Sequence, residues 1–290
     1  MKSKRLGSEI IRLALPATIE NIFQTLVGFF DTLLIAQLGL VAVTAVGLAN
    51  TILNVYLAVF LAIGVGGTAL IARSLGAGQK EKARQYARQT QELSIAGGIV
   101  FGFISIFFGR WMLQAMGASG SALEDAQVFF YWVGGFSLLH ASMTSLGTIL
   151  RATGDTVTPM KVGIITNVTN VLLDYFLIFG FGSWDGLGIL GTALGTIFAR
   201  LLGCYLLTRE VQKSELALSF QKSRHRKDYQ ELVHVTIPAA LERLVMRLGQ
   251  VIYFSLIVAL GTNVYASHMI AGNIESFTYM PAYGLATAAA

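Results

Sequence analysis

Two carboxylates lie in the middle of long apolar stretches of this sequence. Asp31 belongs to the stretch Pro16–Gly39, and Asp174 to another in which Asn167, Asn170 and Asp174 are spaced i, i+3, i+7 and share one helical face. Hard cations prefer oxygen ligands, and a carboxylate buried beside a like charge can hold a proton near neutral pH. We therefore predict that Asp31 and Asp174, with nearby amide oxygens, form a site for a sodium ion or a proton.

A structural explanation of the same residues has to be weighed against this one. Polar contacts between membrane helices stabilise packing by about 0.6 kcal/mol on average, and amides alone would fit that role. A carboxylate in hydrocarbon costs about 2.5–3.5 kcal/mol on insertion scales and is usually retained for function. The depth of Asp31 and the presence of Asp174 therefore favour a functional site.

Further polar residues accompany Asp31. Glu20 lies eleven residues before it, about three helical turns or ~16 Å away and on nearly the same side of a helix. Gln24 lies one turn beyond Glu20. The motif Pro-Ala-x-x-Glu that ends at Glu20 recurs, ending at Glu242. Both glutamates lie near one membrane surface, so an interfacial role is the alternative to lining a substrate cavity, which we predict for Gln24, Asn167, Glu20 and Glu242.

Composition indicates an integral membrane protein and not an enzyme. The chain has 290 residues, 54% hydrophobic and 13% charged, whereas soluble domains are about 25% charged. The single cysteine, Cys204, excludes an internal disulfide and a cysteine metal site. Neither a Walker loop nor a catalytic Ser/His/Asp cluster is present, and the glycine motif at Gly186–Gly191 lacks the preceding strand that a dinucleotide site needs. We expect no cofactor except a coupling sodium ion or proton.

Eight apolar segments must position these side chains, and their length predicts membrane-spanning helices. They are Leu13–Leu38, Ala45–Ala72, Glu92–Leu113, Val128–Leu150, Val162–Gly182, Leu187–Thr208, Thr236–Leu260 and Val264–Ala290. Gly98-x-x-x-Gly102 and Gly191-x-x-x-Gly195 predict close helix packing. Seventeen lysines and arginines lie in the N-terminal tail and in alternate connections, against only Arg110 in the others. This distribution predicts a cytoplasmic N-terminus in a multi-pass cell membrane protein, and it explains the positive net charge without nucleic acid.

The internal repeat predicts two lobes. We assign residues 1–208 to a six-helix N-lobe, 209–235 to a cytoplasmic linker and 236–290 to the first two helices of a C-lobe. An even number of helices gives both copies the same orientation, so the lobes form a parallel repeat. The N-lobe continues well beyond the point that matches the end of the chain. We therefore expect a truncated form of a longer protein; the alternative is a shortened relative.

Several stretches together resemble the multidrug and toxic compound extrusion (MATE) family, and within it the DNA-damage-inducible protein F-like branch. The resemblance covers nearly the whole chain and is most specific at LGAG and RxxGDTxTP. The stretches are ALPATIENIFQTLVGFFDTLLIAQLG, ARSLGAGQKEKAR (Ala72–Arg84), RATGDTVTPM (Arg151–Met160), NVTNVLLDYFLIFG (Asn167–Gly180) and GILGTALGT (Gly188–Thr196).

The resemblance implies a 12-helix antiporter, present here incompletely, that exports organic and often cationic compounds against inward sodium or protons. It places Asp31, Asn170, Asp174 and Thr196 at the cation site and Gln24 in the same cavity. Some relatives carry an acid where this chain has Met246, so a cation site in the C-lobe is in doubt. Small organic molecules and the lipid bilayer are the expected partners of a monomer.

Two other functions stay open. A lipid-linked precursor flippase of the same superfamily would line its cavity with basic residues to hold a pyrophosphate, whereas the first helix carries acids and amides after Arg12. A passive channel or a structural membrane protein would show no exchange of one solute for another.

Overall fold

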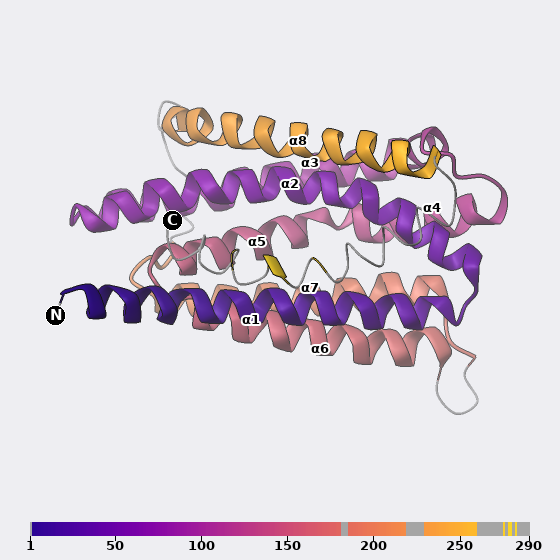
Figure 1. Cartoon of the computed structure of the whole chain (residues 1–290), viewed down its shortest axis with the longest axis horizontal. Coiled ribbons are helices and arrows are strands. Elements are labelled where there is room, and N and C mark those ends of the chain that lie inside the picture. Colours follow the sequence, from indigo (N-terminus) through magenta and orange to yellow (C-terminus); the bar gives the residue numbers. More distant parts are fainter. Residues whose placement is uncertain are drawn as a thin grey trace.

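The computed structural model describes residues 2–180, 185–218 and 229–259, together with residues 275, 278, 279 and 282. The elements in these ranges are all α-helices, which confirms the predicted all-α class (Figure 1). In chain order they are α1 (Lys2–Ala36), α2 (Leu40–Gly76), α3 (Lys80–Ala115), α4 (Gly120–Gly135), α5 (Ser137–Ala152), α6 (Val157–Phe179), α7 (Ile189–Lys213) and α8 (Tyr229–Ala259).

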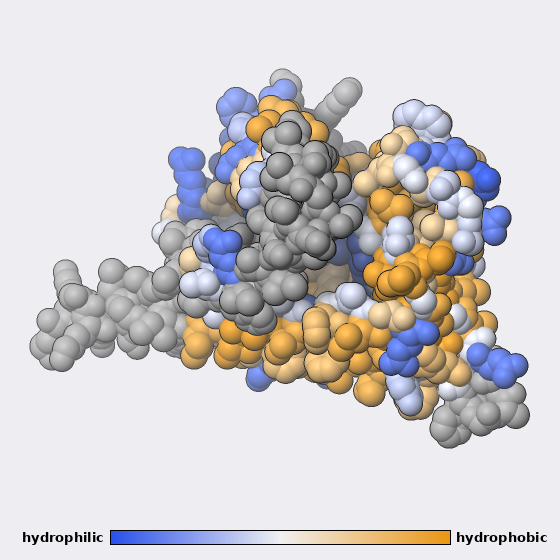
Figure 2. All heavy atoms as spheres, turned by 45° about the vertical axis from the view of Figure 1, so that its right-hand side comes forward, coloured by the Kyte–Doolittle hydropathy of each residue, from blue (hydrophilic) through white to orange (hydrophobic). Residues whose placement is uncertain are grey.

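Five helices are long and apolar enough to cross a membrane, and the bent pair α4 and α5 makes a sixth span if counted as one. These six spans correspond to the first six predicted segments. Their outer faces expose large apolar side chains, such as Phe29 on α1, Phe107 on α3 and Phe176 on α6. Figure 2 shows hydrophobic residues, in orange, along the lower edge of the molecule, where Figure 1 places α1 and α6. So large an exposed apolar surface requires a lipid environment.

The fourth predicted segment, Val128–Leu150, is a broken span. It is two helices, α4 and α5, bent by 46° at Phe136, whose ψ of 27° departs from helical values. Two glycines, Gly134 and Gly135, precede the bend and have low helix propensity. Some helices also begin well before the predicted segments, as α3 does at Lys80 and not at Glu92, because apolarity marks only the part of a helix that lies in hydrocarbon.

The seventh predicted segment, Thr236–Leu260, coincides with α8 up to Ala259, and its last residue lies outside the described residues. Within the described part of the chain, α8 is not among the helices apolar enough to qualify as spans, since it carries Glu242, Arg243 and Arg247. The eighth predicted segment, 264–290, lies outside the described residues except for four isolated positions. The relation between the two lobes therefore stays a prediction.

In Figure 1, α8 lies along the upper edge of the bundle, and α1 and α6 lie along the lower edge. α6 packs against α7, α2 against α8, and α1 mainly against α6. Glycines allow α3 to approach its neighbours closely. A Cβ added to Gly98 would lie 2.6 Å from the Cα of Leu138, and one added to Gly102 would lie 2.6 Å from the carbonyl oxygen of Gly135. The close packing predicted for this glycine pair is confirmed.

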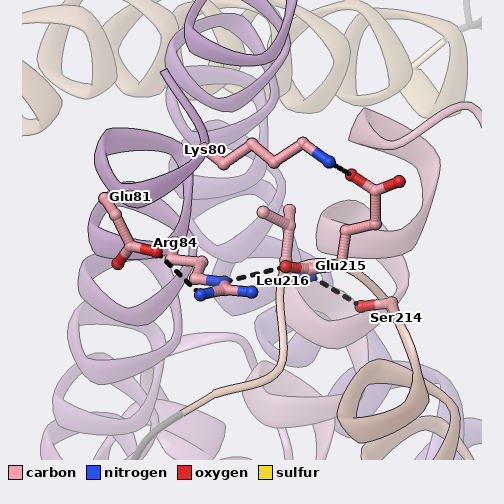
Figure 3. Close-up of polar contacts among 6 residues, drawn as sticks. All are labelled: Lys80, Glu81, Arg84, Ser214, Glu215 and Leu216. Carbon is pink, nitrogen blue, oxygen red and sulfur yellow. Dashed lines mark hydrogen bonds and ion pairs between the residues drawn. The ribbon is translucent and has the colours of Figure 1, made fainter. Parts of the chain in front are cut away.

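Connections that are rich in lysine and arginine meet at one end of the bundle, which we call the basic end. There the start of α3 contacts the segment that follows α7 (Figure 3). Lys80 Nζ lies 2.7 Å from Glu215 Oε2, and Arg84 Nε donates a 2.8 Å hydrogen bond to the Glu215 carbonyl oxygen. The hydrogen bond from Lys80 holds the pKa of the Glu215 carboxyl below its usual value. The segment that follows α7 is therefore held against the start of α3.

An ion pair ties α1 to α5 at the same end. Arg151 Nη1 donates to Glu20 Oε2 over 3.4 Å, and the two side chains are only 25% and 16% exposed. The carboxylate of Glu20 also lies against Gly163 of α6, where an added Cβ would be 3.4 Å from Glu20 Oε1. This contact sets the position of α1 three turns before Asp31.

We predict that Glu20 and Arg151 are energetically coupled. Glu20→Gln or Arg151→Gln alone leaves one partly buried charge unpaired and should lower the free energy of unfolding by about 1–3 kcal/mol. The double variant should lose less than the sum of the two single losses, because neither charge is then left alone. Thermal unfolding of the purified protein in detergent measures all three.

The exposed pair Glu81 and Arg84 provides the control, since Glu81→Gln should change stability little. Strictly additive losses for Glu20→Gln and Arg151→Gln would show that the pair contributes no coupling.

Candidate functional site

A cavity of about 270 Å³ lies between α1, α2, α4, α6 and α7. Apolar side chains such as Val46, Phe129 and Val133 form much of its wall. Its polar lining includes Asp31, Asn50, Asn170, Thr192, Thr196 and Arg200. A mostly apolar cavity with a few converging polar groups is typical of a small-ligand site.

Helical periodicity turns Asp31 into this cavity. Gly28, Asp31, Thr32 and Ile35 all line it, at the i, i+3, i+4, i+7 spacing of one helix face. The preceding aromatic side chains point the other way, as the exposed ring of Phe30 shows. The lipid-facing aromatic residues of α1 thus fix the rotation of the helix that aims the carboxylate inward.

Asp174 is 1% exposed and lies where α6 and α7 pack together. A Cβ at Gly195 would overlap Asp174 Oδ1, and a Cβ at Gly191 would overlap the carbonyl oxygen of Leu177. The close packing predicted for this glycine pair is confirmed. Only a residue without a side chain at position 195 leaves room for the Asp174 carboxylate between the two helices.

Buried polar atoms without a hydrogen-bond partner gather around these two acids. Among the described residues they include Asp31 Oδ1, Asp174 Oδ1, Asn167 Nδ2, Asn170 Nδ2 and Thr192 Oγ1. The negative charge of Asp31 also acts on Asp174. An unpaired buried polar atom costs about 1–3 kcal/mol, so a ligand that satisfies several of them would bind favourably.

The chemistry of this group suits a small cation. Carboxylate, hydroxyl and amide oxygens are all ligands that a hard cation accepts, and the Asn side chains can present their oxygen in place of nitrogen by rotating. A proton would instead neutralise one carboxylate and remove the repulsion between the two. The geometry fits both ions.

The structure brings together the four residues predicted for the cation site. Asp31, Asn170 and Thr196 line one cavity, and Asp174 lies one helical turn from Asn170 in the adjoining α6–α7 interface. The Thr196 hydroxyl donates a 2.9 Å hydrogen bond to the carbonyl oxygen of Thr192, so its oxygen is left to accept from or ligate a second group.

The other predicted residues lie elsewhere. Gln24 is exposed on α1, and Glu242 is exposed on α8, which packs mainly against α2. Glu20 pairs with Arg151 at the basic end. Asn167 is half-buried, one turn before Asn170. None of these four lines the cavity, and their part in substrate binding stays a prediction.

Sequence reasoning missed Arg200, Asn50 and Thr192. Arg200 had a readable signal, because it is an arginine inside an apolar helix and one turn beyond Thr196, and such residues usually face a cavity. Asn50 had no comparable signal. A lone amide in an apolar helix fits lipid-shielded packing equally well.

Comparison with known proteins finds one family model and several membrane transporters. The family model MatE matches residues 16–176. A Thermotoga maritima protein named "Probable multidrug resistance protein NorM" is 32% identical over 98% of this chain. A Shewanella oneidensis "FAD transporter" is 27% identical over 94% of it. An outward-facing structure of a multidrug resistance MATE family transporter of the MOP superfamily is 25% identical over 97% of it, with a TM-score of 0.88.

The chain spans about three fifths of each of these proteins, namely 61% of both relatives and 62% of the solved chain. The family model covers more than half of the 290 residues, and its matched region contains the predicted motifs of α1, α2 and α6. The chain therefore belongs to the multidrug and toxic compound extrusion family of membrane transporters.

Proposed function

We propose that this protein is a secondary active antiporter that exports organic, often cationic, compounds in exchange for inward sodium ions or protons. The observation that carries the proposal is that two acid oxygens are buried without a hydrogen-bond partner among the described residues. Asp31 Oδ1 belongs to a residue that lines the cavity, and Asp174 lies one helical turn from the lining residue Asn170. The multidrug resistance named for the Thermotoga relative supports export of drug-like compounds.

Neutralisation of buried charge supplies the coupling. A cation on Asp31 and Asp174 removes the cost of two carboxylates in a low-dielectric site. The cation favours the conformation of the transporter that binds it more tightly. It shifts the equilibrium between the two conformations only by its difference in affinity for them. A membrane potential adds about 2.3 kcal/mol per charge for each 100 mV, which is enough to drive uphill export.

The proposed access route, orientation and partners come from the sequence analysis. Rocking of the two lobes about the cavity alternates access, as in other parallel-repeat transporters, with the basic end and the N-terminus in the cytoplasm. Small organic molecules and the lipid bilayer are the partners, and the protein acts as a monomer in the cell membrane.

A lipid-linked precursor flippase is the second candidate. One relative is named for the transport of FAD, which carries phosphate groups and is not a cation. Arg200 puts one positive charge in the cavity. A pyrophosphate carrier needs several such charges. The carboxylate of Asp31 in the same lining favours the antiporter.

We predict that Asp31→Asn and Asp174→Asn each reduce ion-driven efflux to the rate of protein-free vesicles. Each change removes a charge but almost no volume, so the protein should still be produced and inserted normally. Efflux of an organic cation from proteoliposomes is measured with a sodium gradient and a pH gradient applied separately, and the gradient that drives transport identifies the coupling ion.

Glu81→Gln, which removes an exposed acid at the basic end, is the matched control and should transport normally. Wild-type rates in both aspartate variants would remove the proposed mechanism, and flux without exchange would indicate a channel.

We also predict that Gly195→Ala is far more damaging than Gly47→Ala. The added methyl group at position 195 would overlap Asp174 Oδ1, whereas the one at position 47, in the lining of the same cavity, has no neighbour within 4 Å. Overpacking of this kind costs about 1–3 kcal/mol. Gly195→Ala should therefore lower both the unfolding temperature and the efflux rate, and Gly47→Ala neither.

Equal behaviour of the two alanine variants in both assays would mean that Asp174 does not depend on the space at Gly195.

A further inference from the structure

Arg200 is a positive charge in the middle of a membrane helix that the coupling scheme does not use. It lies eleven residues after the start of α7 and thirteen before its end at Lys213, and it lines the cavity together with Asp31 and Asn170. The other basic residues described in the membrane-spanning helices lie toward their ends. An arginine at this depth costs several kcal/mol unless it meets an anion or water.

The structure provides Arg200 with no internal counter-ion that would explain its retention. Among the ion pairs that the described residues form, none includes Arg200. The groups close enough to interact with it electrostatically are His140 of α5 and Cys204, one turn further along α7. The thiol of Cys204 donates to the carbonyl oxygen of Leu139. Neither neighbour supplies a carboxylate.

Arginine is suited to one kind of partner. Its planar guanidinium presents parallel N–H groups that match a carboxylate or phosphate in a bidentate contact. Asp31, in the same lining, suits an ammonium group. A ligand that carries both an anionic group and an amine could therefore meet both side chains at once.

We propose that Arg200 binds the anionic group of the transported compound and thereby selects organic substrates that carry a carboxylate or phosphate beside an amine. This inference rests on the proposed export function for the direction of transport, but binding itself tests it. Arg200 acts as a specificity residue, and the ligand's amine and the coupling ion compete for Asp31.

Three dansyl compounds of nearly the same size provide the test. Nε-dansyl-lysine carries an amine and a carboxylate, dansylcadaverine carries the amine alone, and 6-(dansylamino)hexanoate carries the carboxylate alone. Their affinities are measured by dansyl fluorescence on the full chain in lipid nanodiscs, with empty nanodiscs subtracted. We expect the wild-type protein to bind Nε-dansyl-lysine several-fold more tightly than either single-charge compound.

Variants at position 200 separate recognition from folding. Arg200→Gln removes a charged hydrogen-bond partner and should weaken the binding of Nε-dansyl-lysine by about tenfold or more. Its affinity for dansylcadaverine, which has no carboxylate, should change by less than about twofold. Arg200→Lys keeps the positive charge but not the planar guanidinium that makes the bidentate contact, so it should lose only part of the preference for Nε-dansyl-lysine. Arg209→Gln removes an exposed arginine from the same helix and should behave as wild type.

Several outcomes would overturn the inference. Equal wild-type affinity for Nε-dansyl-lysine and dansylcadaverine would do so, as would equal weakening of both in Arg200→Gln, which indicates a structural role. If Arg200→Gln does not fold, the wild-type comparison and Arg200→Lys still decide. Absence of saturable binding for all three compounds would also contradict the inference. The antiporter function is tested separately, by ion-driven efflux in the aspartate variants.

Discussion

A charge buried between membrane helices has to be compensated from within the protein or by something that the protein binds. Asp31 and Arg200 line one cavity here, and Asp174 lies in the adjoining α6–α7 interface. Lipid cannot satisfy them and, among the described residues, neither acid oxygen Oδ1 has a hydrogen-bond partner. A ligand that compensates these charges would therefore bind favourably in the cavity.

Close packing of α6 and α7 makes this site possible. Gly191 and Gly195 bring the backbone of α7 against Leu177 and Asp174 of α6. Such contact excludes water from the carboxylate and lowers the local dielectric, which strengthens every electrostatic interaction in the site. The same glycine pattern that stabilises helix association by van der Waals contact thus also sets the electrostatic environment of the proposed cation site.

The basic end shows a different kind of contact. Tyr86 of α3 donates a hydrogen bond to Glu231, and Tyr229 donates one to Glu92, so α8 is joined to α3 from both sides. Lys80 and Glu215 add an exposed ion pair. Surface ion pairs contribute little free energy each. These contacts join α3 and α8 near the surface, whereas glycine packing joins the helices of the interior.

The amino-acid sequence by itself determined that the chain is a helical membrane protein, where the first six spans lie, and which acids lie deep within them. These properties follow from local hydrophobicity and from the helical period. The tertiary structure decided which residues share a cavity. It added Arg200 and Thr192 to the lining and left Glu20, Gln24, Asn167 and Glu242 outside it. It also broke the fourth segment at Phe136. The spacing of residues along the sequence could not predict these results, because the distances between helices depend on how side chains from distant segments pack together.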